Sequence, residues 1–138
     1  MITKLLTAVL LVLTAFMIWG CGFSDAVVSA AETGFKRDIK AVGLVSTFKK
    51  VKTVEKQSDG RAMLVYFESD VRWFTLEEAV NDKDHPQDPQ TYVDTIDYVR
   101  SNLQTGAPKL GAQEVIKGAA ILIKTEVGWE YKGLTRGE

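Results

Sequence analysis

The only histidine of the chain lies in a run of acidic and turn-forming residues. His85 follows Asp82 and Asp84, and Asp88 comes shortly after it. Closely spaced carboxylate and imidazole groups bind metal ions or transfer protons. A calcium loop, however, needs oxygen ligands at alternate positions, a central glycine and a late glutamate, and this run has no such glycine. The pattern therefore favours a solvated turn over a metal or acid–base site.

A second group with catalytic side-chain types consists of the carboxylates Glu77, Glu78, Asp94 and Asp97. Two carboxylates held at a fixed separation across a cleft hydrolyse glycosidic bonds. Acidic residues near the start of a helix also have an ordinary purpose, because they complement the helix dipole. No serine lies in a Gly-x-Ser-x-Gly context, which a serine hydrolase of the elbow type requires. We therefore predict no catalytic residue, no bound metal and no cofactor.

The large aromatic residues suggest contact with a partner instead of catalysis. Trp129 and Tyr131 are two residues apart, so they share one face of an extended strand. Tryptophan and tyrosine are favoured at protein interfaces, and the same rings also fill cores. The pattern favours packing against the helices, and Trp129, Tyr131 and Trp73 are the candidate binding residues if these rings instead form a contact surface.

The start of the chain has the pattern of an export signal. Lys4 precedes an uncharged apolar run over residues 5–18, and a short positive start followed by about 7 to 15 apolar residues is typical of a secretory signal. The run ends in Ile18-Trp19-Gly20-Cys21. This tetrapeptide resembles a bacterial lipobox, with an aliphatic first residue, a small third residue and the cysteine that receives the lipid; Trp19 is larger than the usual second residue.

The resemblance implies that residues 1–20 are a signal peptide and that Cys21 carries the lipid, with palmitate among its acyl chains. The domain is then exported and held on a membrane of the bacterial cell envelope. Gly22 in place of aspartate implies outer-membrane sorting in a host with two membranes. Two alternatives stay open. Cleavage after Ala30 would discard Cys21, and an uncleaved segment from residue 5 to residue 23 is close to the roughly 20 residues of a transmembrane helix.

Composition limits the architecture and the partners. The chain has 138 residues, with 17 basic and 18 acidic side chains, which suits one small domain. No basic stripe is present, so we expect no nucleic-acid partner. Cys21 is the only cysteine, so the domain is expected to be stabilised by packing and not by a disulfide.

The region after Cys21 is small and polar, and we predict a flexible tether over residues 21–38 followed by a single domain over 39–138. A short helix over 26–31 is the alternative. Residues 41–55 and 61–68 are rich in β-branched and aromatic residues and predict a hairpin around Asp59-Gly60. Because 61–68 is almost continuously apolar, we expect that strand to be buried on both faces.

Two helices and two further strands follow. Thr75 and Glu78 have the spacing of a capping box, and Asp88-Pro89 predicts the start of a second helix. One face of that helix carries apolar residues at helical spacing, namely Tyr92, Ile96, Val99 and Leu103. Residues 115–123 and 129–132 return to strand character.

The expected fold class is α+β. It consists of a small antiparallel sheet of four strands in the order strand, strand, helix, helix, strand, strand, with two helices on one face. The expected function is that of a non-enzymatic cell-envelope lipoprotein, a binding or assembly module for an envelope protein, a peptide or a glycan. The alternatives are a small secreted or tethered hydrolase using the His85 loop, and an inhibitor or immunity-type protein of an envelope enzyme.

Overall fold

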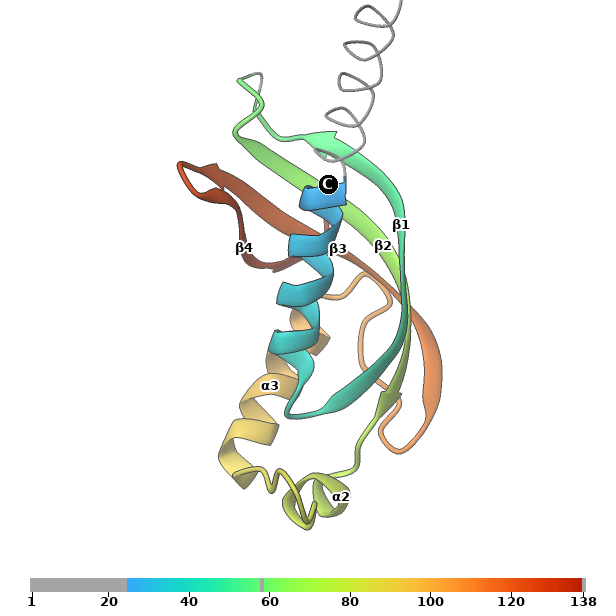
Figure 1. Cartoon of the computed structure of the whole chain (residues 1–138). Coiled ribbons are helices and arrows are strands. Elements are labelled where there is room, and N and C mark those ends of the chain that lie inside the picture. Colours follow the sequence, from blue (N-terminus) through green and yellow to red (C-terminus); the bar gives the residue numbers. More distant parts are fainter. Residues whose placement is uncertain (1–24, 58, 138) are drawn as a thin grey trace, which may run out of the picture.

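The computed structural model of the chain describes residues 25–57 and 59–137. Four antiparallel strands form one open sheet in the order β1-β2-β3-β4. They are β1 (Gly43–Glu55), β2 (Ala62–Trp73), β3 (Gln113–Thr125) and β4 (Gly128–Thr135), with α2 (Leu76–Val80) and α3 (Pro89–Asn102) inserted between β2 and β3. The predicted α+β class with four antiparallel strands is confirmed (Figure 1).

The predicted β1–β2 hairpin is present. At the start of β2 both faces are buried, since Leu64 and Val65 are both buried, but from Tyr66 onward only one face is. Val65, Phe67 and Val71 alternate with partly exposed residues such as Tyr66 and Glu68. The buried set defines the inner face of the sheet, which the helices cover. Because a strand side chain alternates between faces, a nearly continuous apolar run still leaves every second residue on the outer face.

Irregular pairing bends the sheet around the helices. The register of β1 with β2 shifts between Val45 and Thr47 and again between Lys50 and Lys52. A third shift occurs where Ile121 pairs with Gly133 and Leu122 pairs with Tyr131, so β4 carries Lys132 as an extra residue. Bulges of this kind bend a strand and increase its twist, and the sheet curves around the helices in Figure 1.

A helix over residues 25–39 replaces most of the predicted tether. Its apolar residues recur every four positions, and Val27, Ala31, Phe35 and Ile39 are all buried. The Phe35 ring lies 4.8 Å from the Phe67 ring, centroid to centroid, so the 25–39 helix packs on the inner face of the sheet (Figure 1). The tether prediction is therefore wrong from residue 25 onward, because this stripe makes the segment part of the core.

The front of the chain lies outside the described residues. This region includes the predicted signal peptide over 1–20 and the predicted lipid acceptor Cys21. Within residues 25–57 and 59–137, the structure contains no helix that is both long enough and apolar enough to cross a membrane.

Both predicted helix starts are confirmed. Thr75 Oγ1 accepts a hydrogen bond from the Glu78 backbone N–H at 3.2 Å, and the Glu78 carboxylate accepts one from the Thr75 N–H at 3.3 Å. Two hydrogen bonds lower the pKa of the Glu78 carboxyl; the one from Arg72 has the larger effect and the one from the Thr75 N–H the smaller. Asp88 caps α3 by accepting from the Thr91 N–H at 3.1 Å, with proline in its first turn.

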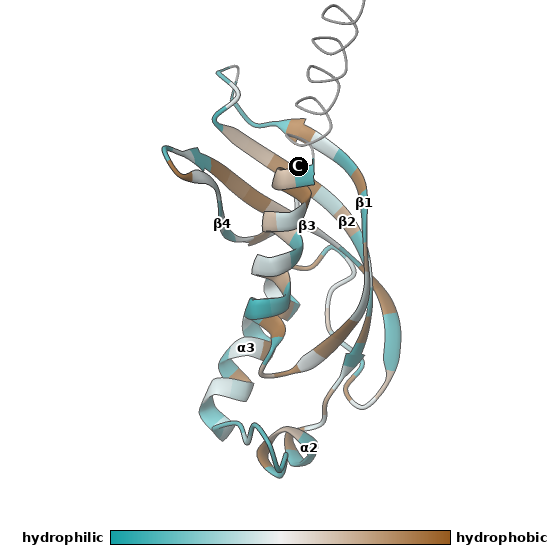
Figure 2. Cartoon of the chain, viewed as in Figure 1, coloured by the Kyte–Doolittle hydropathy of each residue, from teal (hydrophilic) through white to brown (hydrophobic). Residues whose placement is uncertain are grey.

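The face predicted for α3 also packs inward. Tyr92, Val99 and Leu103 are buried, and Ile96 is half-buried against the same core. The helices that cover the inner face are α3 and the 25–39 helix, whereas the short α2 lies at one end of the sheet beside α3 (Figure 1). In Figure 2, apolar residues recur along the strands, and the segment that joins α2 to α3 is largely hydrophilic.

Candidate functional site

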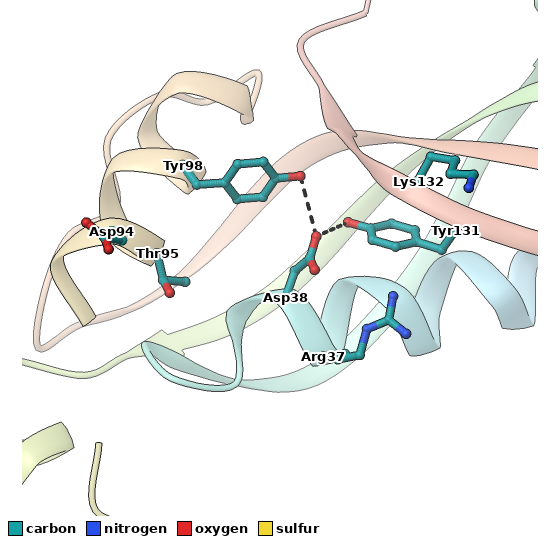
Figure 3. Close-up of a pocket in the computed structure, with 7 residues that line it drawn as sticks. All are labelled: Arg37, Asp38, Asp94, Thr95, Tyr98, Tyr131 and Lys132. Carbon is teal, nitrogen blue, oxygen red and sulfur yellow. Dashed lines mark hydrogen bonds between the residues drawn. The ribbon is translucent and has the colours of Figure 1, made fainter. Parts of the chain in front are cut away.

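A polar cleft forms where three elements meet. Asp38 comes from the 25–39 helix, Tyr98 from α3 and Tyr131 from β4 (Figure 3). The Tyr131 hydroxyl donates to Asp38 Oδ2 at 2.7 Å, and the Tyr98 hydroxyl donates to the same oxygen at 3.4 Å. The cleft has a volume of about 430 Å³, and its lining residues are Arg37, Asp38, Asp94, Thr95, Tyr98, Tyr131 and Lys132.

A glycine determines how closely the 25–39 helix approaches β4. A Cβ atom added to Gly34 would lie 2.1 Å from the Tyr131 ring, so this ring lies against bare backbone. The guanidinium carbon of Arg37 lies 5.9 Å from the centroid of the same ring. Tyr131 therefore contributes to helix docking through its ring and to the cleft through its hydroxyl.

The two tyrosine hydroxyls are held in the protonated, donating form. Burial is the main cause that raises the pKa of Tyr131, and the hydrogen bond and charge of Asp38 raise it further. Burial also raises the pKa of Tyr98, whose oxygen accepts from the Leu134 N–H at 2.7 Å. Asp38 is consequently surrounded by fixed donors over the whole physiological pH range.

The bulge in β4 supplies a cation to the cleft. Lys132 is the extra residue of that bulge, and the next residue, Gly133, has a φ of 136°, a value that favours glycine. Bulges re-aim side chains near functional sites. Lys132 pairs with Glu130 at 3.0 Å, and both side chains are about half exposed, so the ammonium group remains accessible to a partner.

Charges of both signs line the cleft. Arg37 and Lys132 provide cations, while Asp38 and Asp94 provide carboxylates. Asp94 accepts a hydrogen bond from Gln90 at 2.9 Å. Such a site offers donors and acceptors side by side. Within the described part of the chain, no three His, Cys, Asp or Glu side chains are grouped to hold a metal.

The residues of the His85 loop do not converge on this cleft. Asp82 Oδ1 accepts from the backbone N–H groups of Asp84 and His85, at 2.9 Å each. These two bonds, the one from His85 first, lower the pKa of the Asp82 carboxyl. Asp88 is used as the cap of α3. His85 is exposed beside a separate hollow of about 320 Å³ that also involves Lys40 and Phe74.

Two of the other predicted carboxylates, Glu78 and Asp97, have local partners. The Glu78 carboxylate accepts a hydrogen bond from the Thr75 N–H and pairs with Arg72 at 2.6 Å. Asp97 pairs with Arg100 one turn later on α3, and Asp94 is the only one of the four carboxylates that lines the cleft. The paired arrangement that sugar hydrolysis requires is not seen among these contacts.

The three candidate aromatic residues have different environments. Trp73 is fully buried, and its indole N–H donates to Glu114 at 2.8 Å, so it cannot present a contact surface and its prediction as a binding residue is wrong. Trp129 is half-buried against the core. Tyr131 is half-buried too, yet it lines the cleft. For Trp129 and Tyr131, binding stays a prediction.

Arg37 and Asp38 were missed because the sequence interpretation placed them in a tether. The signal that would have revealed them is the four-residue spacing of the apolar residues between positions 27 and 39. Comparisons with protein-family models, with curated proteins and with solved structures found no significant match for this chain. The site is therefore defined by the geometry of this chain.

Proposed function

We propose that the protein is a non-enzymatic lipoprotein of the bacterial cell envelope, and that its domain is a binding or assembly module whose contact site is the cleft described above. The observation that carries this proposal is the convergence of the 25–39 helix, α3 and β4 on one cleft with both cations and carboxylates. The lipobox-like sequence ending at Cys21 supports the proposed location on a membrane of the cell envelope.

The cleft has the anatomy of a contact site. Its centre is preorganised, because the Asp38 carboxylate is fixed by two tyrosine hydroxyls. Its rim is formed by the exposed side chains Arg37, Asp94 and Lys132. Interfaces commonly place an aromatic or arginine anchor at the centre and polar groups around it. We infer that the partner is another envelope protein. A segment of that protein would present its own hydrogen-bond donors and acceptors to the cleft.

Charge reversal at the rim tests this site. We expect Lys132→Glu to remove a partner that is co-purified from crosslinked membranes with the unaltered chain. Lys83→Glu is the matched control, because Lys83 is an exposed lysine outside the cleft. Thermal melting of each variant checks that the fold is retained. Equal capture by the unaltered chain and both variants would rule out the cleft as the contact site.

The proposed lipid anchor has its own test. Metabolic labelling with a palmitate analogue should tag the chain, and Cys21→Ser should abolish the tag. The full acyl set of a mature lipoprotein gives stable anchoring, whereas a single chain is marginal. A tag that persists on Cys21→Ser would contradict lipidation at this residue.

A further inference from the structure

Two turns of the sheet lie at the end of the domain where the N-terminal segment joins it. The chain reverses direction at residues 40–42, where the Val42 N–H donates to the Ile39 carbonyl at 2.8 Å, so β1 runs back along the 25–39 helix. The β1–β2 turn and the β3–β4 turn both reach the end where residue 25 lies (Figure 1). They are joined by a hydrogen bond from the Lys124 N–H to the Arg61 carbonyl at 2.8 Å.

The lengths of the two elements place the turns beyond the start of the helix. A helix over residues 25–39 rises about 22 Å. The 13 residues of β1 extend about 40 Å along the strand. The β1–β2 turn therefore projects past residue 25. The chain from Cys21 to residue 25 spans at most about 14 Å. A lipid on Cys21 therefore keeps these turns close to the membrane.

The surface at this end has the chemistry of a lipid-facing surface. The second half of β1 and the turn that follows it, residues 49–61, contain five basic and two acidic residues. Lys49 and Lys50 in the strand and Lys56 after it are exposed, as is Glu126 in the other turn. Basic side chains beside a membrane are attracted to anionic headgroups. The turn between β3 and β4 carries Val127, which is fully exposed, and an apolar side chain at such a tip gains by entering the boundary between headgroups and acyl chains.

We propose that the two turns rest on the anionic headgroup surface of the same bilayer that anchors the chain, with Val127 at the lipid boundary and the lysines of residues 49–56 facing anionic lipids. This orientation rests on the proposed lipid anchor. It directs α2 and the His85 loop away from the membrane, because they lie at the opposite end of the domain (Figure 1).

The test uses the full chain, matured in cells and reconstituted in vesicles of phosphatidylcholine with phosphatidylglycerol. An environment-sensitive maleimide fluorophore is attached to Val127→Cys or, as the matched control at the far end, to Asp84→Cys. Quenching is measured with a lipid that carries a spin label on its headgroup. We expect quenching to be several-fold stronger at position 127 than at position 84. Equal quenching at the two positions would overturn the orientation.

A second pair of variants tests the charges. Lys50→Glu with Lys56→Glu, made in the Val127→Cys chain, should reduce its quenching at least severalfold on anionic vesicles. The same number of reversals at Lys83 and Lys109, two other exposed lysines, should leave it unchanged. Quenching that survives the first pair would overturn the assignment of those lysines to anionic lipid.

One further control separates this orientation from the anchor on which it depends. The chain without an added cysteine should take no maleimide and should float with the vesicles, because the Cys21 sulfur is blocked by its lipid. Labelling of that chain, or failure to float, would count against the lipid anchor itself. Flotation with equal quenching at positions 127 and 84 would count against the orientation alone.

Discussion

The Asp38 cleft and the His85 loop both gather carboxylates with polar partners, yet they are built in different ways. In the loop, Asp82 bonds to backbone groups two and three residues away. In the cleft, Asp38 bonds to hydroxyls 60 and 93 residues away. The loop therefore uses its carboxylate to shape a turn, whereas the cleft exists only when three distant elements are packed together. A cluster of polar residues in sequence is thus a weaker sign of a site than a cluster formed by the fold.

The largest effect is expected where the cleft depends on the packed helix. Phe35 is fully buried, so Phe35→Ala should lower the free energy of unfolding by about 3–5 kcal/mol. Lys36→Ala, at the exposed neighbouring position, should change it by no more than about 0.5 kcal/mol. Urea unfolding of a chain that begins before residue 25 measures both. Similar small losses would mean that the segment is a tether after all.

A double-mutant cycle tests the contact between the 25–39 helix and β4. Gly34→Ala should cost about 1–3 kcal/mol, because the new methyl group meets the Tyr131 ring. In a Tyr131→Ala background the same change should be neutral or stabilising by up to about 1 kcal/mol, since alanine is the better helix former. Chemical denaturation of the four proteins gives the coupling. Equal costs in both backgrounds would contradict the packing of Tyr131 on Gly34.

Alkaline pH distinguishes the cleft from the loop. The pKa of Tyr131 is raised in the folded protein, so above its ordinary value of 10.0 the unfolded chain loses the phenol proton first. Stability should therefore fall as the pH rises past that value, by at most about 1.4 kcal/mol per pH unit from this residue. Tyr131→Phe should lessen the fall, whereas His85→Ala should not. Denaturation at several alkaline pH values checks the difference.

The smallest effect is expected in the loop. Asp82→Ala should lower the Tm only slightly, because the carboxylate is exposed and its bonds are local. Its pKa is lowered in the folded protein, so its contribution is present at neutral pH and is lost as the pH falls through the folded pKa. The Tm of the variant and of the unaltered chain should then converge in acid. A large loss of stability, or loss of partner capture, would contradict the interpretation that the Asp82 carboxylate only shapes a turn.

Local patterns in the sequence predicted local structure well. The Thr75–Glu78 capping box, the Asp88 cap and the buried face of α3 all follow from residues within a few positions of one another. The cleft did not follow, because Asp38 and Tyr131 are brought together only when the 25–39 helix packs against β4. The 25–39 helix was missed although its apolar stripe is visible, because its intervening polar and small residues also suit a linker.

Site-specific crosslinking tests most directly the claim that the cleft, and not the loop, is the contact site. A photo-reactive phenylalanine derivative replaces Asp94, an exposed residue of the cleft, or Asp84, an exposed residue of the loop, in the full chain in cells. We predict a discrete adduct of constant mass from position 94 and none from position 84. The same adduct from both positions, or an adduct from position 84 alone, would contradict the assignment of the contact site to the cleft.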